Sequence, residues 1–135
     1  MHKAISSLFL ILLMIFNGCA TTKLTQKQLQ LIENADYGEY PTDYEKIVKD
    51  YFSRFLFDPY SAVYRIGQPY KGYLGKPPIL GGGPDKFGYL VDVSVNAKNR
   101  YGGYVGERQY SVLILNGQVI GQYPTFFQEE LLRGY

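Results

Sequence analysis

The alternation of apolar and polar residues predicts three neighbouring strands in the second half of the chain. From Tyr89 to Asn96 every second residue is apolar, which is the period of a strand with one buried face. The period returns in Tyr110–Ile114 and, after the hairpin signal Asn116-Gly117, in Val119–Tyr123. These three segments predict an antiparallel meander whose valine side is buried and whose Asp92 side faces solvent.

A helical period comes earlier, over about residues 43–57. Its apolar stripe is formed by Tyr44, Ile47, Val48, Tyr51 and Phe55, with Phe52 and Leu56 widening it. Thr42 and Glu45 have the spacing of a capping box, and Pro59 is expected to stop the helix because it disfavours helical angles in the residue before it. The stripe requires a sheet or a second helix to cover it.

The remaining segments complete an α+β fold. Residues 62–66 predict a short strand, and the glycine- and proline-rich stretch 67–88 predicts a long irregular loop. A short closing helix is expected from Thr125 onward. The prediction is therefore an N-terminal amphipathic helix packed on a small antiparallel sheet of three or four strands, with a short C-terminal helix.

The N-terminal residues have the pattern of a targeting segment. Met1-His2-Lys3 is basic, and the apolar run Leu8–Phe16 is nine residues long, well short of the roughly 20 that a membrane-spanning helix needs. A signal peptide over residues 1–18 explains both features. We expect a tether over residues 19–41 and a single α+β domain over residues 42–135.

The end of the apolar run resembles the lipobox of bacterial lipoproteins. Phe16-Asn17-Gly18-Cys19 departs from the usual form at Phe16 and Asn17 and keeps Gly-Cys at the expected distance. The resemblance implies cleavage before Cys19 and lipids on that residue, and two or more acyl chains give stable anchoring. A plain secretory signal that leaves Cys19 as an odd thiol is the alternative. Ala20 is not the Asp of an inner-membrane retention signal, which favours the outer membrane, facing the periplasm.

Composition excludes several kinds of chemistry from a mature chain processed in this way. Cys19 is the only cysteine and His2 the only histidine, so no histidine-based triad, cysteine nucleophile or usual zinc site can form. No phosphate-binding or dinucleotide motif is present, and charge is nearly balanced, which argues against a nucleic-acid partner. We expect no cofactor, no metal and no catalytic residues.

Two carboxylates merit separate interpretation. Asp92 lies among valines but on the polar side of its strand, so a solvent-facing position is favoured over a catalytic one. Asp58 precedes Pro59 at the expected helix end, where stabilising a turn is favoured over catalysis. A carboxylate- or tyrosine-dependent enzyme would require Asp92 or Glu107 in a concave pocket.

The segment 96–106 combines amide, cationic and aromatic side chains with glycines. One interpretation is structural, because asparagine side chains fix turns and glycines allow positive φ. The other is a recognition loop, in which tyrosine rings supply contact area and polar groups supply directional hydrogen bonds. The proposed partner-binding residues are Asn96, Lys98, Asn99, Tyr101 and Tyr104.

Through two motifs the chain resembles a group of small uncharacterised bacterial envelope proteins. The first is Asp58-Pro59-x-Ser61-Ala62; the second is Asn96-Ala97-Lys98-Asn99 followed by Tyr101-Gly102-Gly103-Tyr104-x-Gly106. The resemblance covers about residues 43–120 and implies no known activity.

Function is predicted as binding rather than catalysis. The leading hypothesis is an envelope lipoprotein that serves as a structural or accessory subunit of a secretion or cell-wall complex, with an envelope protein or the wall as partner. The first alternative is an inhibitor or sensor of a wall-degrading hydrolase, with 67–88 or 96–106 as a protruding loop. An enzyme that uses carboxylate or tyrosine chemistry is the second.

Overall fold

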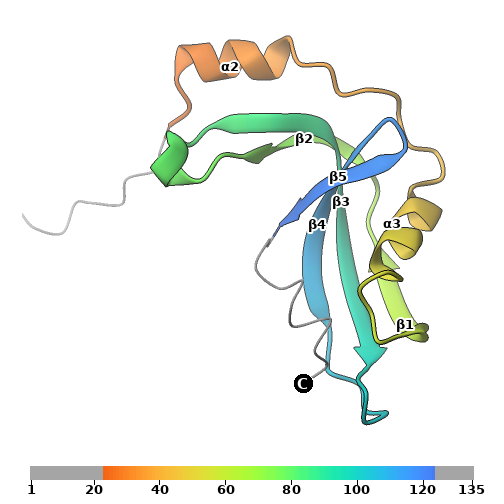
Figure 1. Cartoon of the computed structure of the whole chain (residues 1–135). Helices are drawn as coiled ribbons and strands as arrows, with labels where there is room; N and C mark the ends of the chain where they lie inside the picture. The colour runs from red at the N-terminus through yellow and green to blue at the C-terminus, as the bar shows by residue number, and fades with distance from the viewer. Residues whose placement is uncertain (1–22, 124–135) are drawn as a thin grey trace, which may run out of the picture.

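The computed structural model describes residues 23–123 of the 135-residue chain (Figure 1). Within these residues the chain forms a five-stranded antiparallel sheet and two α-helices, which confirms the predicted α+β class. The predicted signal peptide, Cys19 and the predicted closing helix lie outside the described residues. In chain order the elements are α2 Gln26–Glu33, α3 Tyr44–Phe52, β1 Asp58–Ile66, β2 Tyr70–Gly75, the short 3-10 helix η1 Pro78–Leu80, β3 Pro84–Lys98, β4 Arg108–Leu115 and β5 Gln118–Tyr123.

The long strand β3 organises the sheet. On one edge its first half pairs with β2 and its second half with β1, while β4 runs along its other edge and β5 follows β4. Figure 1 shows β3 bending between these two halves. All pairings are antiparallel, so the predicted meander of β3, β4 and β5 is confirmed.

The predicted loop over 67–88 is wrong, because this segment forms the β2–β3 hairpin and its turn. The turn formers do not break the strands, since they fit particular places in the hairpin. Gly72 lies opposite Gly88, and a Cβ on Gly72 would lie only 2.3 Å from Leu90 Cδ1. Glycine in a strand interior marks such a close approach. The consecutive glycines 81–83 all have positive φ and make the turn.

Other strand predictions hold with longer bounds. The strand expected over 62–66 begins earlier, at Asp58, and is β1. The turn at Asn116-Gly117 has φ of 49° and 77°, as a tight hairpin turn requires, and it connects β4 to β5 as predicted.

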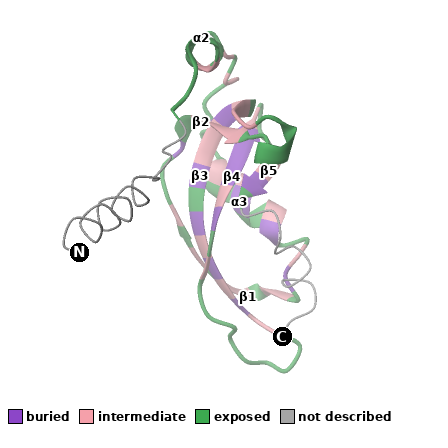
Figure 2. Cartoon of the chain, turned by 90° about the vertical axis from the view of Figure 1, so that its left-hand side faces the viewer, coloured by how far each residue is buried: buried purple, intermediate pink, exposed green. Residues whose placement is uncertain are grey.

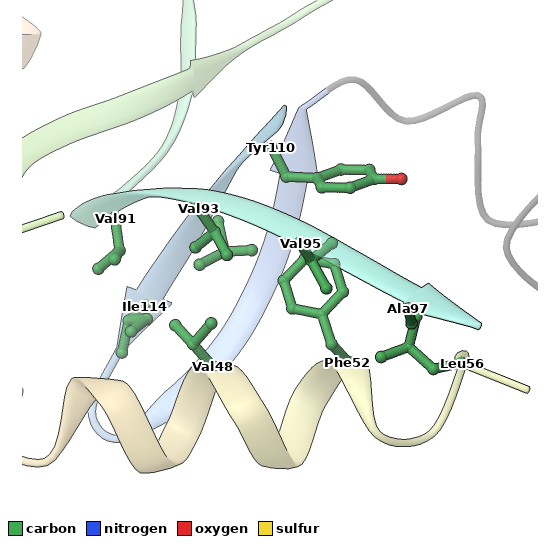
Figure 3. Close-up of a cluster of buried hydrophobic side chains, with 10 residues drawn as sticks. Val48, Phe52, Leu56, Val91, Val93, Val95, Ala97, Tyr110 and Ile114 are labelled. Atoms are coloured by element: carbon green, nitrogen blue, oxygen red, sulfur yellow. The ribbon is translucent and has the colours of Figure 1, made fainter. Parts of the chain in front are cut away.

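The core lies between α3 and one face of the sheet (Figure 3). Phe52 of α3 is fully buried and its ring lies 5.2 Å from that of Tyr110. Each such large apolar side chain contributes roughly 1.5–3 kcal/mol on burial. The buried cluster comprises Val48, Phe52, Leu56, Val91, Val93, Val95, Ala97, Tyr110, Val112 and Ile114.

Helix α3 differs from its prediction at both ends. Its N-cap is Asp43 rather than Thr42, and Asp43 makes no side-chain capping hydrogen bond. The partner of Glu45 is Lys49, at 3.6 Å, instead of the cap. The helix ends at Phe52 rather than near residue 57, because tight turns follow it; the Phe55 amide donates to the Phe52 carbonyl at 2.9 Å.

Residues 26–33, within the predicted tether, form helix α2. Thr25 and Gln28 make a complete capping box at its start. After the helix, the Tyr37 hydroxyl donates to the Ile32 carbonyl at 2.8 Å, and the Tyr37 ring packs edge-on against Phe87 of β3. This segment therefore lies against the β2–β3 hairpin. Within residues 23–123 no helix is long and apolar enough to cross a membrane.

Candidate binding surface

The alternation along β3 separates a covered face from a polar face. Figure 2 shows buried residues recurring along β3. Val91, Val93 and Val95 are buried towards α3, while Asp92 on the opposite side is exposed, as the sequence predicts. The side of the sheet away from α3 is called the polar face below. Register places Ser94 and Asn96 of β3 on this face together with the β1 residues that pair with them.

A shallow groove of about 620 Å³ lies on the polar face. It runs across the centre of the sheet, where β1, β3, β4 and the end of β5 lie side by side. Its principal polar and aromatic lining residues are Arg65, Asp92, Ser94, Gln109, Ser111 and Tyr123.

The Asp92 carboxylate is the acceptor for groups from two other strands. The Ser111 hydroxyl of β4 donates to it, and the Tyr70 hydroxyl of β2 lies 3.4 Å away. Partial burial raises the pKa of Tyr70, and the nearby Asp92 carboxylate raises it further. Tyr70 is therefore a hydrogen-bond donor at neutral pH.

A second polar group of the same face lies nearer the β3–β4 loop. Arg65 of β1 forms an ion pair with Glu107, and the Ser94 hydroxyl donates to the same Glu107 carboxylate at 3.2 Å. The pair is largely exposed, so its contribution to stability is small. Its main effect is to hold the side chains of three segments in one arrangement.

The two asparagines of the proposed partner-binding set hold the backbone of the β3–β4 loop. Asn99 Oδ1 accepts from the amides of Tyr101 at 3.0 Å and Gly103 at 3.2 Å. Asn96 Oδ1 accepts from the Gly106 amide at 3.1 Å. These contacts correspond to the structural interpretation of the asparagines and make the loop well defined.

The other three predicted residues present side chains at the surface of this loop. Tyr101 is 82% exposed. Tyr104 is half exposed, forms an isolated bridge with Lys98, and has the Lys98 ammonium 5.6 Å from its ring centre. The loop thus brings Lys98, Tyr101 and Tyr104 to one end of the sheet, on a backbone that the asparagines hold.

The two sequence motifs, in residues 58–62 and 96–106, meet at this end. Ser61 Oγ accepts from the Lys98 amide at 2.9 Å, and the Tyr104 hydroxyl donates to the Ser61 carbonyl at 3.2 Å. Asp58 Oδ1 accepts from the Ser61 amide at 3.3 Å, the turn-stabilising role predicted for Asp58. The motifs, about 35 residues apart, are therefore two halves of one local structure.

Exposed apolar side chains from the start of β1 extend this end of the molecule. Phe57, Tyr60 and Val63 are each more than half exposed. The sequence did not predict Phe57 and Tyr60 at this surface, because the helical period continues through Phe57 and the strand was expected to begin only at residue 62, whereas Val63 lies within the predicted strand. With Tyr101 and Tyr104 they form a set that we call the distal end.

Catalytic possibilities centre on the two carboxylates named from the sequence. Asp92 and Glu107 are both exposed, and both accept hydrogen bonds, so neither is isolated. Asp92 lines the shallow groove, whereas Glu107 pairs with Arg65 beside it. Across residues 23–123 no three His, Cys, Asp or Glu side chains come together as metal ligands.

Comparisons with protein-family models, with curated proteins and with solved structures found no match.

Proposed function

We propose that this chain is a lipid-anchored envelope protein that acts by binding, as a structural or accessory subunit of a secretion or cell-wall complex. Cys19 carries the lipid, in the outer membrane facing the periplasm. The distal end and the adjoining polar face bind the partner, an envelope protein or the cell wall. The observation that supports this most is the set of exposed tyrosine and apolar side chains at the distal end.

The chemistry of the distal end suits binding. Tyrosine rings give large contact area at low cost in side-chain entropy, and their hydroxyl groups supply directional hydrogen bonds. The loop is held by Asn96 and Asn99, so little conformational freedom is lost on binding. The polar face continues from this end with arranged donors and acceptors, including Arg65 and Gln109.

Crosslinking in cells tests this proposal. A photoreactive amino acid at Tyr101 or Tyr104 is expected to yield an adduct of defined mass with an envelope protein or wall fragment. The same amino acid at Lys49, on the exposed side of α3, is the matched control and is expected to yield none. Equal adducts from all three positions, or a strict monomer after gentle detergent purification, would contradict a specific partner.

A substitution sharpens the same test. Tyr101→Ser removes a ring that is 82% exposed in the free protein and that the partner would bury on binding. An aromatic side chain buried in an interface contributes on the order of 1.4 kcal/mol or more, so recovery of the partner is expected to fall about tenfold. Lys49→Ser is expected to leave recovery unchanged. An unchanged yield with Tyr101→Ser would move the binding site away from the distal end.

The well-defined β3–β4 loop favours one alternative, an inhibitor of a wall-degrading hydrolase. In that case Tyr101 would enter the hydrolase cleft. Unchanged hydrolase activity at high concentrations of the lipoprotein would eliminate this alternative while leaving the binding proposal in place.

A further inference from the structure

We infer that the tip of the β2–β3 hairpin, residues 76–83, rests in the surface of the lipid bilayer that holds the Cys19 anchor. This inference depends on the lipid anchor of the proposed function and adds a second, protein-made membrane contact. It assigns a lipid surface as the partner of Ile79 and Leu80 and fixes which end of the domain faces the membrane.

The hairpin tip presents two large aliphatic side chains to solvent. Ile79 is 92% exposed and Leu80 68% exposed. Exposing adjacent aliphatic side chains to water is unfavourable in free energy. Such exposed apolar patches are typical of surfaces that contact a membrane or a partner. They lie at the end of the hairpin, beyond the last paired residues of β2 and β3.

The tip is built to hold these side chains outward. Pro77 and Pro78 start η1, and the Leu80 and Gly82 amides donate to the Pro77 carbonyl at 2.9 and 3.2 Å. At its base the Lys76 amide donates to the Gly83 carbonyl at 2.8 Å. The tip is therefore a hydrogen-bonded turn in which Ile79 and Leu80 have fixed positions.

The anchored end of the chain lies beside this tip. Figure 1 shows residues 23–25 leading into α2 next to the hairpin turn that contains η1. The Gln28 side chain lies against Gly83, where a Cβ would be 2.2 Å from Gln28 Nε2. Lys23, the first described residue, follows Cys19 by four residues, which can span at most about 14 Å. A lipid on Cys19 therefore keeps this end of the domain close to the bilayer.

Charge and apolar character around the tip match a bilayer surface. Lys23 and Lys27 are exposed before and on α2, and Lys76 pairs with Asp85 at 3.6 Å across the base of the tip. Lysines at this level can reach anionic headgroups while aliphatic residues enter about 5–10 Å into the boundary of the acyl region. The distal end lies at the other end of β3 and would face away from the membrane.

The absence of tryptophan from the sequence allows a direct test. Ile79→Trp and, separately, Leu80→Trp give full-length lipoproteins with a single tryptophan at the tip; Tyr101→Trp is the matched control at the distal end. Each protein is reconstituted in vesicles of phosphatidylethanolamine and phosphatidylglycerol, with or without bromine on the acyl chains. Bromine is expected to quench most of the emission at positions 79 and 80 and to leave position 101 unquenched.

A second measurement distinguishes membrane contact of the hairpin tip from lipidation of Cys19. The mass of the N-terminal peptide from the same vesicles reports whether Cys19 carries lipid. Lipidated, vesicle-bound protein with unquenched tryptophan at 79 and 80, or with quenching at 101 instead, overturns the inference and leaves the anchor standing. Unmodified Cys19 in protein that is not bound to vesicles removes the anchor, and the inference with it.

Discussion

The two faces of β3 are built from alternate residues of one strand, yet they have different partners. Val91, Val93 and Val95 pack against α3, whereas Asp92 and Ser94 form hydrogen bonds with side chains of neighbouring segments. The covered face obtains its stability from apolar burial, and its residues could be exchanged among apolar types. The hydrogen bonds of Asp92 and Ser94 on the polar face are exposed and contribute little to stability, so these residue types need a different explanation, which we propose is binding.

Substitutions on the two faces of β3 should therefore have different effects on stability and on binding. Changes on the covered face should lower the free energy of unfolding by several kcal/mol without a specific effect on binding. Changes to the hydrogen-bonding residues of the polar face or to the distal end should leave the free energy of unfolding nearly unchanged and weaken binding of the partner.

The largest loss of stability is expected from Phe52→Ala. The ring is fully buried between α3 and Tyr110, so its removal leaves a cavity and should cost about 3–5 kcal/mol. Phe57→Ala, at a 60% exposed ring, should cost less than about 0.5 kcal/mol. Urea unfolding followed by circular dichroism measures both. Similar losses at the two positions would contradict the assignment of the core.

Neighbouring residues of β3 compare the two faces most directly. Val93→Ser should cost about 2–4 kcal/mol, because it loses apolar burial and places a hydroxyl in the core. Ser94→Val removes only an exposed hydrogen bond to Glu107 and should change the free energy of unfolding by less than about 0.5 kcal/mol. Comparable destabilisation by both would mean that a second layer covers the polar face as tightly as α3 covers the other.

The covered face could be predicted from the sequence, and the hairpin could not. The valine alternation in β3 and the Asn116-Gly117 turn are local signals, and the structure confirms both. The sequence did not predict the β2–β3 hairpin, because glycines and prolines are typical of turns and loops. Position 72 of β2 is a glycine because the neighbouring side chain of Leu90 occupies the space that a Cβ would need. Such a contact depends on pairing and is invisible in local composition.

Part of the candidate site could likewise be predicted from the sequence, and part could not. From the sequence, loop 96–106 had two interpretations, a turn fixed by asparagines and a recognition loop, and the structure shows that Asn96 and Asn99 do hold its backbone. The contribution of Phe57 and Tyr60 depends on where α3 ends. The helical period continues past Phe52, so periodicity alone extends the helix too far.

The next largest effect is expected from Gly88→Ala, where the bent strand β3 passes close to β4. A Cβ at this position would lie 2.4 Å from the Ile114 carbonyl oxygen, and that backbone is fixed in the sheet. Displacing it should cost about 1–3 kcal/mol. Gly103→Ala is the control, because a Cβ there meets only Asn99 Oδ1, at 3.9 Å, and it should cost less than about 1 kcal/mol. Thermal unfolding of the two variants distinguishes them, and an unaffected midpoint for Gly88→Ala would show that the strands part more easily than their register implies.

The smallest effect concerns Tyr70 and pH. Partial burial, and then the Asp92 carboxylate, raise the pKa of this phenol above the value of about 10 that it has in the unfolded chain. The folded state therefore keeps the Tyr70 proton at pH values where the unfolded state has lost it. This contribution to stability is complete below about pH 10 and is lost as the pH rises through the raised folded pKa.

Tyr70→Phe should accordingly reduce the loss of stability between pH 8 and pH 11, measured by urea unfolding at each pH. Asp92→Asn should shift Tyr70 titration towards lower pH, followed by NMR of the tyrosine ring carbons, which resolves individual residues, because the charge is removed while the burial remains. Burial alone raises the pKa of Tyr64, so that residue should keep its titration in the Asp92→Asn variant. If the two tyrosines moved together, Asp92 would act by loosening the sheet and not through its charge, and the polar face would have a larger share in stability than its exposed hydrogen bonds imply.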